Sequence, residues 1–446
     1  MILGMAIRAA TALGINLRNE SSTPDSHKEI RYRVWWSLYI LEHHLGGMTG
    51  RATAIFDEAC TTPLPVPYDE DRFGTQDVLN LFGREMQKST RNPIAWPPPS
   101  SAKGSTSSSD RSRSVSSSKP GSATPARNVT DMNWAASAPA SASLFFLQYV
   151  QLARLTQDIM NLYNPQVTQS RWSQVQAKIA GLEKSLEHWY THLPSVFDFK
   201  RERHQEYLEY RLSLGFFYHS SRIIVNRPCL CRLDRRIPKQ SVPSRDFNRD
   251  AAVRCVNAAL EMLALIPDEP NAVTLNSVGP WWKIVYYLMQ AAIVMMLELS
   301  FRAAHMPSEA GNILETCKKT VRWLHELGKE NPSAARAWHF CNAQLREIAP
   351  KIGQAVNDIP AHYPGRGGLT SQEIPGSTTG PTVNIAQMAI PSQPALVPSI
   401  PELAAFSVFD QFMPYAPPMG GGEWQTYGPG SAEMEFMSDV YHEQGE

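Results

Sequence analysis

Cysteine is scarce in this 446-residue chain, with six residues spread between positions 60 and 341. So few and so widely spaced cysteines exclude a disulfide framework and are typical of a reducing compartment. Only Cys229 and Cys231 lie close together in sequence, and two thiolates alone cannot complete a tetrahedral zinc site. We therefore expect no disulfide-stabilised fold, no metal site and no cofactor in this chain.

Long apolar runs are missing as well. The longest, residues 284–297, contains Gln290 and is followed by Glu298. It is too short to span a bilayer and predicts a buried helix instead. The first residues also lack the basic start of a signal peptide. We therefore expect no membrane partner.

Motifs of the common enzyme classes are absent. The sequence contains no Gly-x-Ser-x-Gly elbow, no Gly-x-Gly-x-x-Gly turn and no P-loop. The acidic run at residues 69–71 lies between Pro67 and Gly74. That position predicts a loop, whereas a magnesium-dependent helical cyclase needs its acidic motif on a helix. We therefore expect that the chain is not an enzyme.

Charge is present but is unevenly distributed. The chain has 42 basic and 42 acidic residues, yet no Lys or Arg follows Arg366, whereas nine acidic residues do. Residues 1–366 therefore hold 42 basic and 33 acidic side chains, and the remaining residues carry only negative charge. Such a block of one sign predicts a body followed by a separate acidic tail.

The apolar residues recur with helical periodicity, and no run alternates for long enough to predict a strand. In the helix expected near 26–45, Ser26 and Glu29 have the spacing of a capping box, and Gly46-Gly47 ends the helix. Its expected apolar stripe is Val34, Leu38, Leu41 and Leu45, widened by Trp35, Trp36 and Tyr39. A shorter helix with apolar residues Ile2, Met5, Ala6, Ala9 and Leu13 precedes it, and Gly14 suits its C-terminal cap. Later helices are expected near 144–162, 175–189, 204–226, 248–266, 281–304, 309–328 and 334–353. The predicted fold class is all-α.

Composition divides the chain into four parts. Residues 1–95 and 144–356 are predicted to form one multi-helix domain. Residues 96–143 are rich in Ser, Pro and Ala, and residues 357–446 are rich in Pro and Gly. Neither segment has enough apolar residues to offset the entropy lost on ordering, so both are predicted to be disordered.

The tail combines acidic residues with aromatic ones, including Phe409, Phe412 and Trp424. Acidic charge keeps such side chains solvated and available to a partner's groove. This pattern is typical of acidic-hydrophobic activation segments. The alternative is a tail without activity.

The most informative run is residues 29–51. It contains Arg31-Tyr32-Arg33-Val34-Trp35-Trp36 and ends in Gly50-Arg51, and Arg227-Pro228 follows much later. In this order the residues resemble the fungal-specific transcription factor domain of fungal zinc-cluster regulators. The resemblance is good over residues 1–71 and looser to about 355. It departs at Ala52, where the family has proline.

The resemblance implies an all-helical regulatory domain that acts in the nucleus, recruits the transcription machinery or co-activators, and can form a homodimer. Members bind DNA through a zinc cluster built from six closely spaced cysteines, which is absent here, so the start looks truncated. Zinc and DNA contact are therefore expected only from a missing module or a partner. Two alternatives stay open, namely a helical co-regulator without DNA targeting and a small-molecule-sensing helical domain.

The residues that carry the resemblance also have an expected physical role. Trp35 and Trp36 should anchor the core, each with its indole N–H paired. Arg31, Arg33 and Arg51 should hold carboxylates or loop carbonyls through the planar guanidinium group. A ligand-binding role for these arginines is the alternative.

Overall fold

The computed structural model describes residues 2–20, 25–50, 53–76, 78, 138–164, 167, 170–201, 206–230 and 240–361. These residues form α-helices and short 3-10 helices and contain no strand, so the all-α prediction is confirmed. Most of the predicted linker 96–143 and nearly all of the tail 357–446 lie outside the described residues.

The chain divides into two compact units. Unit 1 comprises Met1–Glu42, Thr53–Gln151 and His192–Pro194, and unit 2 comprises His43–Ala52, Leu152–Thr191 and Ser195–Glu446. Two helices, α2 (Asp25–Thr49) and α5 (Ala142–Met160), contribute residues to both units. The four-part division predicted from composition stays a prediction.

Unit 1 begins with α1 (Ile2–Ala12). As predicted, Gly14 ends this helix region, with a φ of 65° and backbone bonds from Gly14 N to Thr11 O and from Ile15 N to Ala10 O. The predicted apolar face was wrong. Ile7 and Ala10 are the buried residues, whereas the expected core residues Ile2, Met5 and Leu13 are exposed.

Helix α2 corrects three predictions. It begins at Asp25, so Ser26 lies inside the helix and does not cap it. Its buried face is aromatic, because Trp35, Trp36 and Tyr39 are buried as predicted and Tyr32 joins them, whereas Val34 and Leu41 of the predicted stripe are exposed. The helix also continues through Gly46-Gly47 to Thr49, and Gly50, with a φ of 62°, follows its end. Two helical glycines cost only about 1 kcal/mol each, which tertiary packing can offset.

Unit 1 also holds an extended loop between two 3-10 helices, η1 (Asp57–Ala59) and η2 (Glu70–Arg72). The loop has no strand partner for its backbone. Its N–H and C=O groups are therefore paired with α2 side chains and with the segment after α1. Thr61 N, for example, donates to Asn16 O at 3.0 Å.

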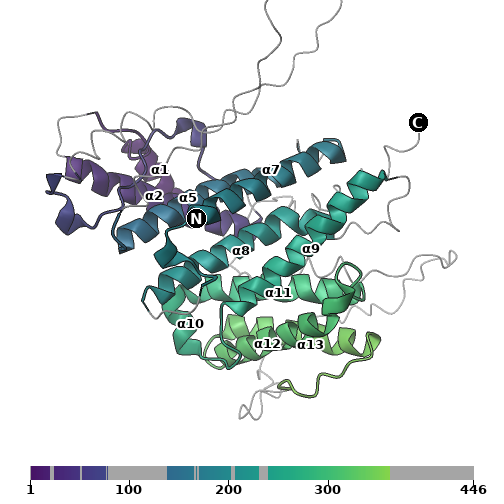
Figure 1. Ribbon diagram of the computed structural model, residues 1–446. Helices are drawn as coiled ribbons and strands as arrows, with labels where there is room; N and C mark the ends of the chain where they lie inside the picture. The colour runs from purple at the N-terminus through teal and green to yellow at the C-terminus, as the bar shows by residue number, and fades with distance from the viewer. Residues whose placement is uncertain are drawn as a thin grey trace, which may run out of the picture. The chain divides into compact units, whose positions relative to one another are not determined.

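Unit 2 is a helical bundle. After α5 come η3 (Asn161–Tyr163), α7 (Trp172–Thr191), η4 (Ser195–Phe197), α8 (Leu208–Leu230), α9 (Val242–Ala264), α10 (Ala272–Val278), α11 (Trp281–Ser300), η6 (Pro307–Glu309), α12 (Ala310–Gly328) and α13 (Pro332–Lys351). Each of these α-helices except the short α10 overlaps a helix predicted from the sequence. The core joins α8 to α13, and α11 contacts α8, α9, α10, α12 and α13 (Figure 1).

Helix α11 lies within the predicted segment 281–304 and contains the longest apolar run. At 20 residues it is long and apolar enough to cross a membrane by length and composition alone. However, 72% of its most apolar window is buried inside the protein, and residues on all its faces pack against neighbouring helices. It therefore serves as the central core helix of unit 2, as the sequence predicted.

Candidate functional site

The side chains of Glu29, Arg33 and Trp36 on α2 form a cluster that we call the α2 clamp. Arg33 donates from Nε to Glu29 Oε1 at 2.9 Å and from Nη2 to the carbonyls of Val66 and Tyr68 at 3.2 and 2.6 Å. Glu29 also accepts from Val66 N at 2.9 Å. The clamp therefore pairs both the donor and the acceptor of the loop backbone at Val66.

Trp36 completes the clamp, since its Nε1 donates to Pro63 O at 2.7 Å. Trp35 is more deeply buried, at 1% exposure, yet its Nε1 has no hydrogen-bond partner among the described residues. Both tryptophans are thus core residues as predicted, but only Trp36 has its indole paired. The adjacent Tyr39 packs edge-on against Trp36 at 5.1 Å between ring centroids.

Burial controls the electrostatics of the clamp. Glu29 is 2% exposed, and desolvation raises its pKa, while the hydrogen bond and charge of Arg33 act in the opposite direction. The Arg33 guanidinium also lies 5.0 Å from the centroid of the Phe73 ring. The predicted hold on carboxylates and loop carbonyls is therefore observed at Arg33. Arg31 makes a single exposed bond to Leu13 O at 3.1 Å.

The clamp also reaches the start of α5. Arg33 Nη1 donates to Ser143 Oγ at 3.1 Å, and Ser143 in turn donates from N and Oγ to Asp69 Oδ1 at 3.2 and 2.6 Å. Ser141 Oγ donates to Pro67 O at 3.4 Å. These bonds tie the segment before residues 79–137 to the segment after them.

The Arg227-Pro228 pair lies in unit 2, just past the predicted helix end at residue 226, but the helix does not end there. Instead α8 continues through Pro228 to Leu230. Proline has no N–H, so the carbonyl of Ile224 loses its usual helical donor. Tyr163 from η3 supplies one, with its hydroxyl 2.5 Å from Ile224 O, and the Arg227 guanidinium lies 5.4 Å from the Tyr163 ring centroid.

The remaining predicted residues are not brought together by the described structure. Gly50 is exposed and ends α2. Arg51, Phe409, Phe412 and Trp424 lie outside the described residues. Among the described residues, no group of three or more His, Cys, Asp or Glu side chains could hold a metal ion.

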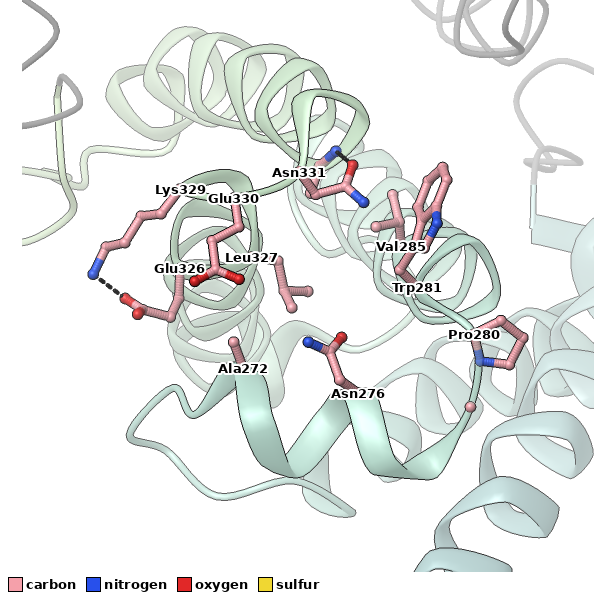
Figure 2. Close-up of a pocket in the computed structure, with 12 residues that line it drawn as sticks. Ala272, Asn276, Pro280, Trp281, Val285, Glu326, Leu327, Lys329, Glu330 and Asn331 are labelled. Carbon is pink, nitrogen blue, oxygen red and sulfur yellow. Dashed lines mark hydrogen bonds and ion pairs between the residues drawn. The ribbon is translucent and has the colours of Figure 1, made fainter.

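Unit 2 contains a cavity of about 440 Å³ that sequence reasoning missed. It lies between the ends of four helices, α10, α11, α12 and α13, and Figure 2 shows Trp281 and Val285 on one side of it and Glu326 and Glu330 on the other. Trp281 is 45% exposed, unlike the fully buried Trp323 and Trp338 of the adjacent helices. The sequence did contain a signal for this cavity, namely two adjacent tryptophans, Trp281 and Trp282, that follow Gly279-Pro280. Adjacent residues on a helix point in different directions, so only one of the two rings can face the core.

Comparison with known proteins agrees with the family resemblance of residues 29–51. Residues 1–191 match the family model of the fungal specific transcription factor domain. The transcription regulator galc of Aspergillus niger is 32% identical over 394 residues, which is 80% of this chain and 45% of the relative. The chain thus spans less than half the length of this relative. No solved structure matches the chain.

Two further relatives match shorter stretches. Both are uncharacterised transcriptional regulatory proteins of Schizosaccharomyces pombe, one 35% identical over 82 residues and the other 31% identical over 154 residues. These stretches cover 18% and 33% of this chain, and 10% and 19% of the relatives. Residues 1–191 of this chain are therefore a fungal specific transcription factor domain.

Proposed function

We propose that the chain is the regulatory and activation portion of a fungal zinc-cluster transcription factor, acting in the nucleus on RNA polymerase II transcription. The carrying observation is the match of residues 1–191 to the fungal specific transcription factor domain. The names of the relatives, all transcription regulators, support the same role. In this proposal the protein acts by binding partners and not as an enzyme.

DNA contact is proposed to come from a zinc-cluster module or from a partner, because the six cysteines of this chain are far apart. The tail 357–446 has one basic residue, and residues 1–366 carry only a modest basic excess, so no strong phosphate-binding surface is expected. A gel shift with purified protein should give no sequence-specific complex. A specific complex at physiological salt would overturn this part of the proposal.

The tail is proposed to be the segment that recruits co-activators or the transcription machinery. Residues 400–446 fused to a foreign DNA-binding domain should activate a reporter. Replacing Phe409, Phe412 and Trp424 with alanine should lower the output, because aromatic rings supply apolar contact area for a partner's groove. Unchanged output in the triple variant would contradict the aromatic mechanism, and replacing Ser407, Gln411 and Gln425 is the matched control.

Two other functions stay under consideration. A co-regulator without DNA targeting would associate with a full-length zinc-cluster factor, and co-purification from fungal nuclei would identify that factor. A small-molecule-sensing domain would bind a metabolite, and the cavity near Trp281 favours this addition to the main proposal. The family resemblance allows a homodimer, and light scattering distinguishes a dimer from a monomer.

A further inference from the structure

The cavity at the ends of α10, α11, α12 and α13 has the size of a ligand site, since typical sites enclose about 300–1,000 Å³. Its floor is apolar and rigid, because Leu327 and Ala334 belong to the core of unit 2. Its walls are helix ends, not long loops, which favours a preformed shape. All lining residues belong to unit 2.

One wall is aromatic and accessible. Trp281, the first residue of α11, is the most exposed tryptophan among the described residues, while its helix neighbour Trp282 is partly buried. Leaving an apolar indole ring in water is less favourable than burying it, so a ligand that covers the ring gains free energy. An exposed indole face beside a cavity provides a surface on which a cation or a flat group can stack.

The opposite wall is acidic. Glu326 and Glu330 lie at the C-terminal end of α12, where the helix dipole favours positive charge and disfavours carboxylates. Lys329 compensates for one of them, with Nζ 2.5 Å from Glu326 Oε2. Glu330 has no ion-pair partner among the described residues, so the charged lining has one excess negative charge.

The polar groups between these walls add no positive charge. Asn276 is exposed at the lower edge of the cavity (Figure 2). The side-chain oxygen of Asn331 accepts from Ser333 N and Ala334 N, so this amide caps α13. The cavity therefore offers an aromatic face, a carboxylate without a partner and an apolar floor.

We propose that this cavity binds a small organic ammonium ion, with the cation between the Trp281 indole and the Glu330 carboxylate. An ammonium ion would satisfy the excess negative charge at the end of α12, and its carbon atoms would cover the apolar floor. An anion would meet Glu330 unfavourably, and a neutral ligand would leave its charge uncompensated. Binding of the ligand does not depend on the proposed function. A regulatory effect of the ligand on transcription would rest on the proposed function.

The test is calorimetric titration of the full-length protein with choline and with its uncharged carbon isostere 3,3-dimethylbutan-1-ol. Choline should bind saturably and about 2- to 30-fold more tightly than the alcohol, since a cation on an aromatic face contributes about 0.5–2 kcal/mol. Equal affinities would overturn the proposal, and so would the lack of saturable choline binding up to about 10 mM, a concentration far above the Kd of a specific site.

Variants locate the site. Trp281→Leu and Glu330→Gln should each weaken choline binding by about tenfold, while Trp281→Phe should retain part of it. Both side chains are exposed, so the folding of these variants should be unaffected. Glu347→Gln is the matched control, because this carboxylate lies on α13 and pairs with Lys351 outside the cavity. Undiminished binding in Trp281→Leu would overturn the proposal.

These results are separable from the proposed function. A loss of choline binding in both variants together with unchanged reporter activation would support the ligand site and leave the activation proposal intact. Failure of the tail to activate a reporter would contradict the activation proposal without affecting the titration.

Discussion

At the scale of single residues, the α2 clamp depends on the shape of arginine and not only on its charge. Arg33 bonds a carboxylate, a hydroxyl and two carbonyls in four directions, which the single ammonium of lysine cannot reproduce. The buried carboxylate of Glu29 makes any loss costly, because it would stay desolvated without its partner.

We therefore predict that Arg33→Lys lowers the free energy of unfolding by about 2–3 kcal/mol and that Arg33→Met lowers it by about 3–5 kcal/mol. Chemical denaturation followed by circular dichroism measures both. Arg31→Lys is the control, because Arg31 makes one exposed bond, and its effect should stay within about 0.5 kcal/mol. Equal effects at the two positions would contradict the clamp.

Pro228 and Tyr163 form a second residue-scale device, in which a hydroxyl replaces a missing backbone donor. Tyr163→Phe should cost about 1–3 kcal/mol by leaving Ile224 O without a donor. In a Pro228→Ala background the restored N–H can bond that carbonyl, so the same change should cost about 1 kcal/mol less. A double-mutant cycle measures the difference, and strict additivity would show that the tyrosine does not compensate for the proline.

His43 links stability to pH. It is fully buried in unit 2, and desolvation lowers its pKa from 6.5 to about 4. Between these pH values His43 binds a proton in the unfolded chain but not in the folded protein. Its contribution to the free energy of unfolding is therefore complete above pH 6.5 and is lost as the pH falls toward 4. The expected loss is about 3 kcal/mol, read from urea unfolding midpoints. His43→Asn should flatten this slope, and an unchanged slope would contradict the assignment.

At the scale of elements, the hydrogen bonds between Asp69 and Ser143 connect the described segments that precede and follow residues 79–137. We predict that replacing these 59 residues with about ten Gly and Ser residues keeps the helical content. Because the loop to be closed is shorter, the free energy of unfolding should rise by about 1–2 kcal/mol.

Thermal unfolding with circular dichroism tests this replacement. Ser143→Ala in the shortened chain should remove much of the increase in the free energy of unfolding, because Asp69 would then lose the hydroxyl group that connects the two segments. Aggregation or loss of helix in the shortened chain would show that residues 79–137 are part of the folded unit.

The helices could be predicted from sequence because their apolar periodicity is strong, as in α7, where the regularly spaced Val175, Ile179, Leu186 and Trp189 of the predicted segment 175–189 are buried. The exact buried faces of α1 and α2 could not, since Ile7 and Ala10 are buried in α1 in place of Ile2 and Met5, and Val34 of α2 is exposed beside the buried aromatic residues. The role of Arg33 followed from guanidinium chemistry. Its loop partners Val66 and Tyr68, and the cavity at Trp281, depend on tertiary packing that a pattern does not contain.

At the scale of the whole molecule, the chain joins a helical regulatory part to an acidic tail, and the proposed function assigns a separate task to each. The clamp and the α11 core would hold the regulatory part in one shape, and the tail would contact the transcription machinery. Both parts must act from the same polypeptide for the proposal to hold.

The most direct measurement is a tethering assay in a fungal cell, with residues 1–446 fused to a foreign DNA-binding domain and a reporter behind its binding site. We predict activation well above the DNA-binding domain alone, and loss of that activation when the fusion ends at residue 361. Reporter output indistinguishable from the DNA-binding domain alone, at equal protein abundance in the nucleus, would contradict the proposed function.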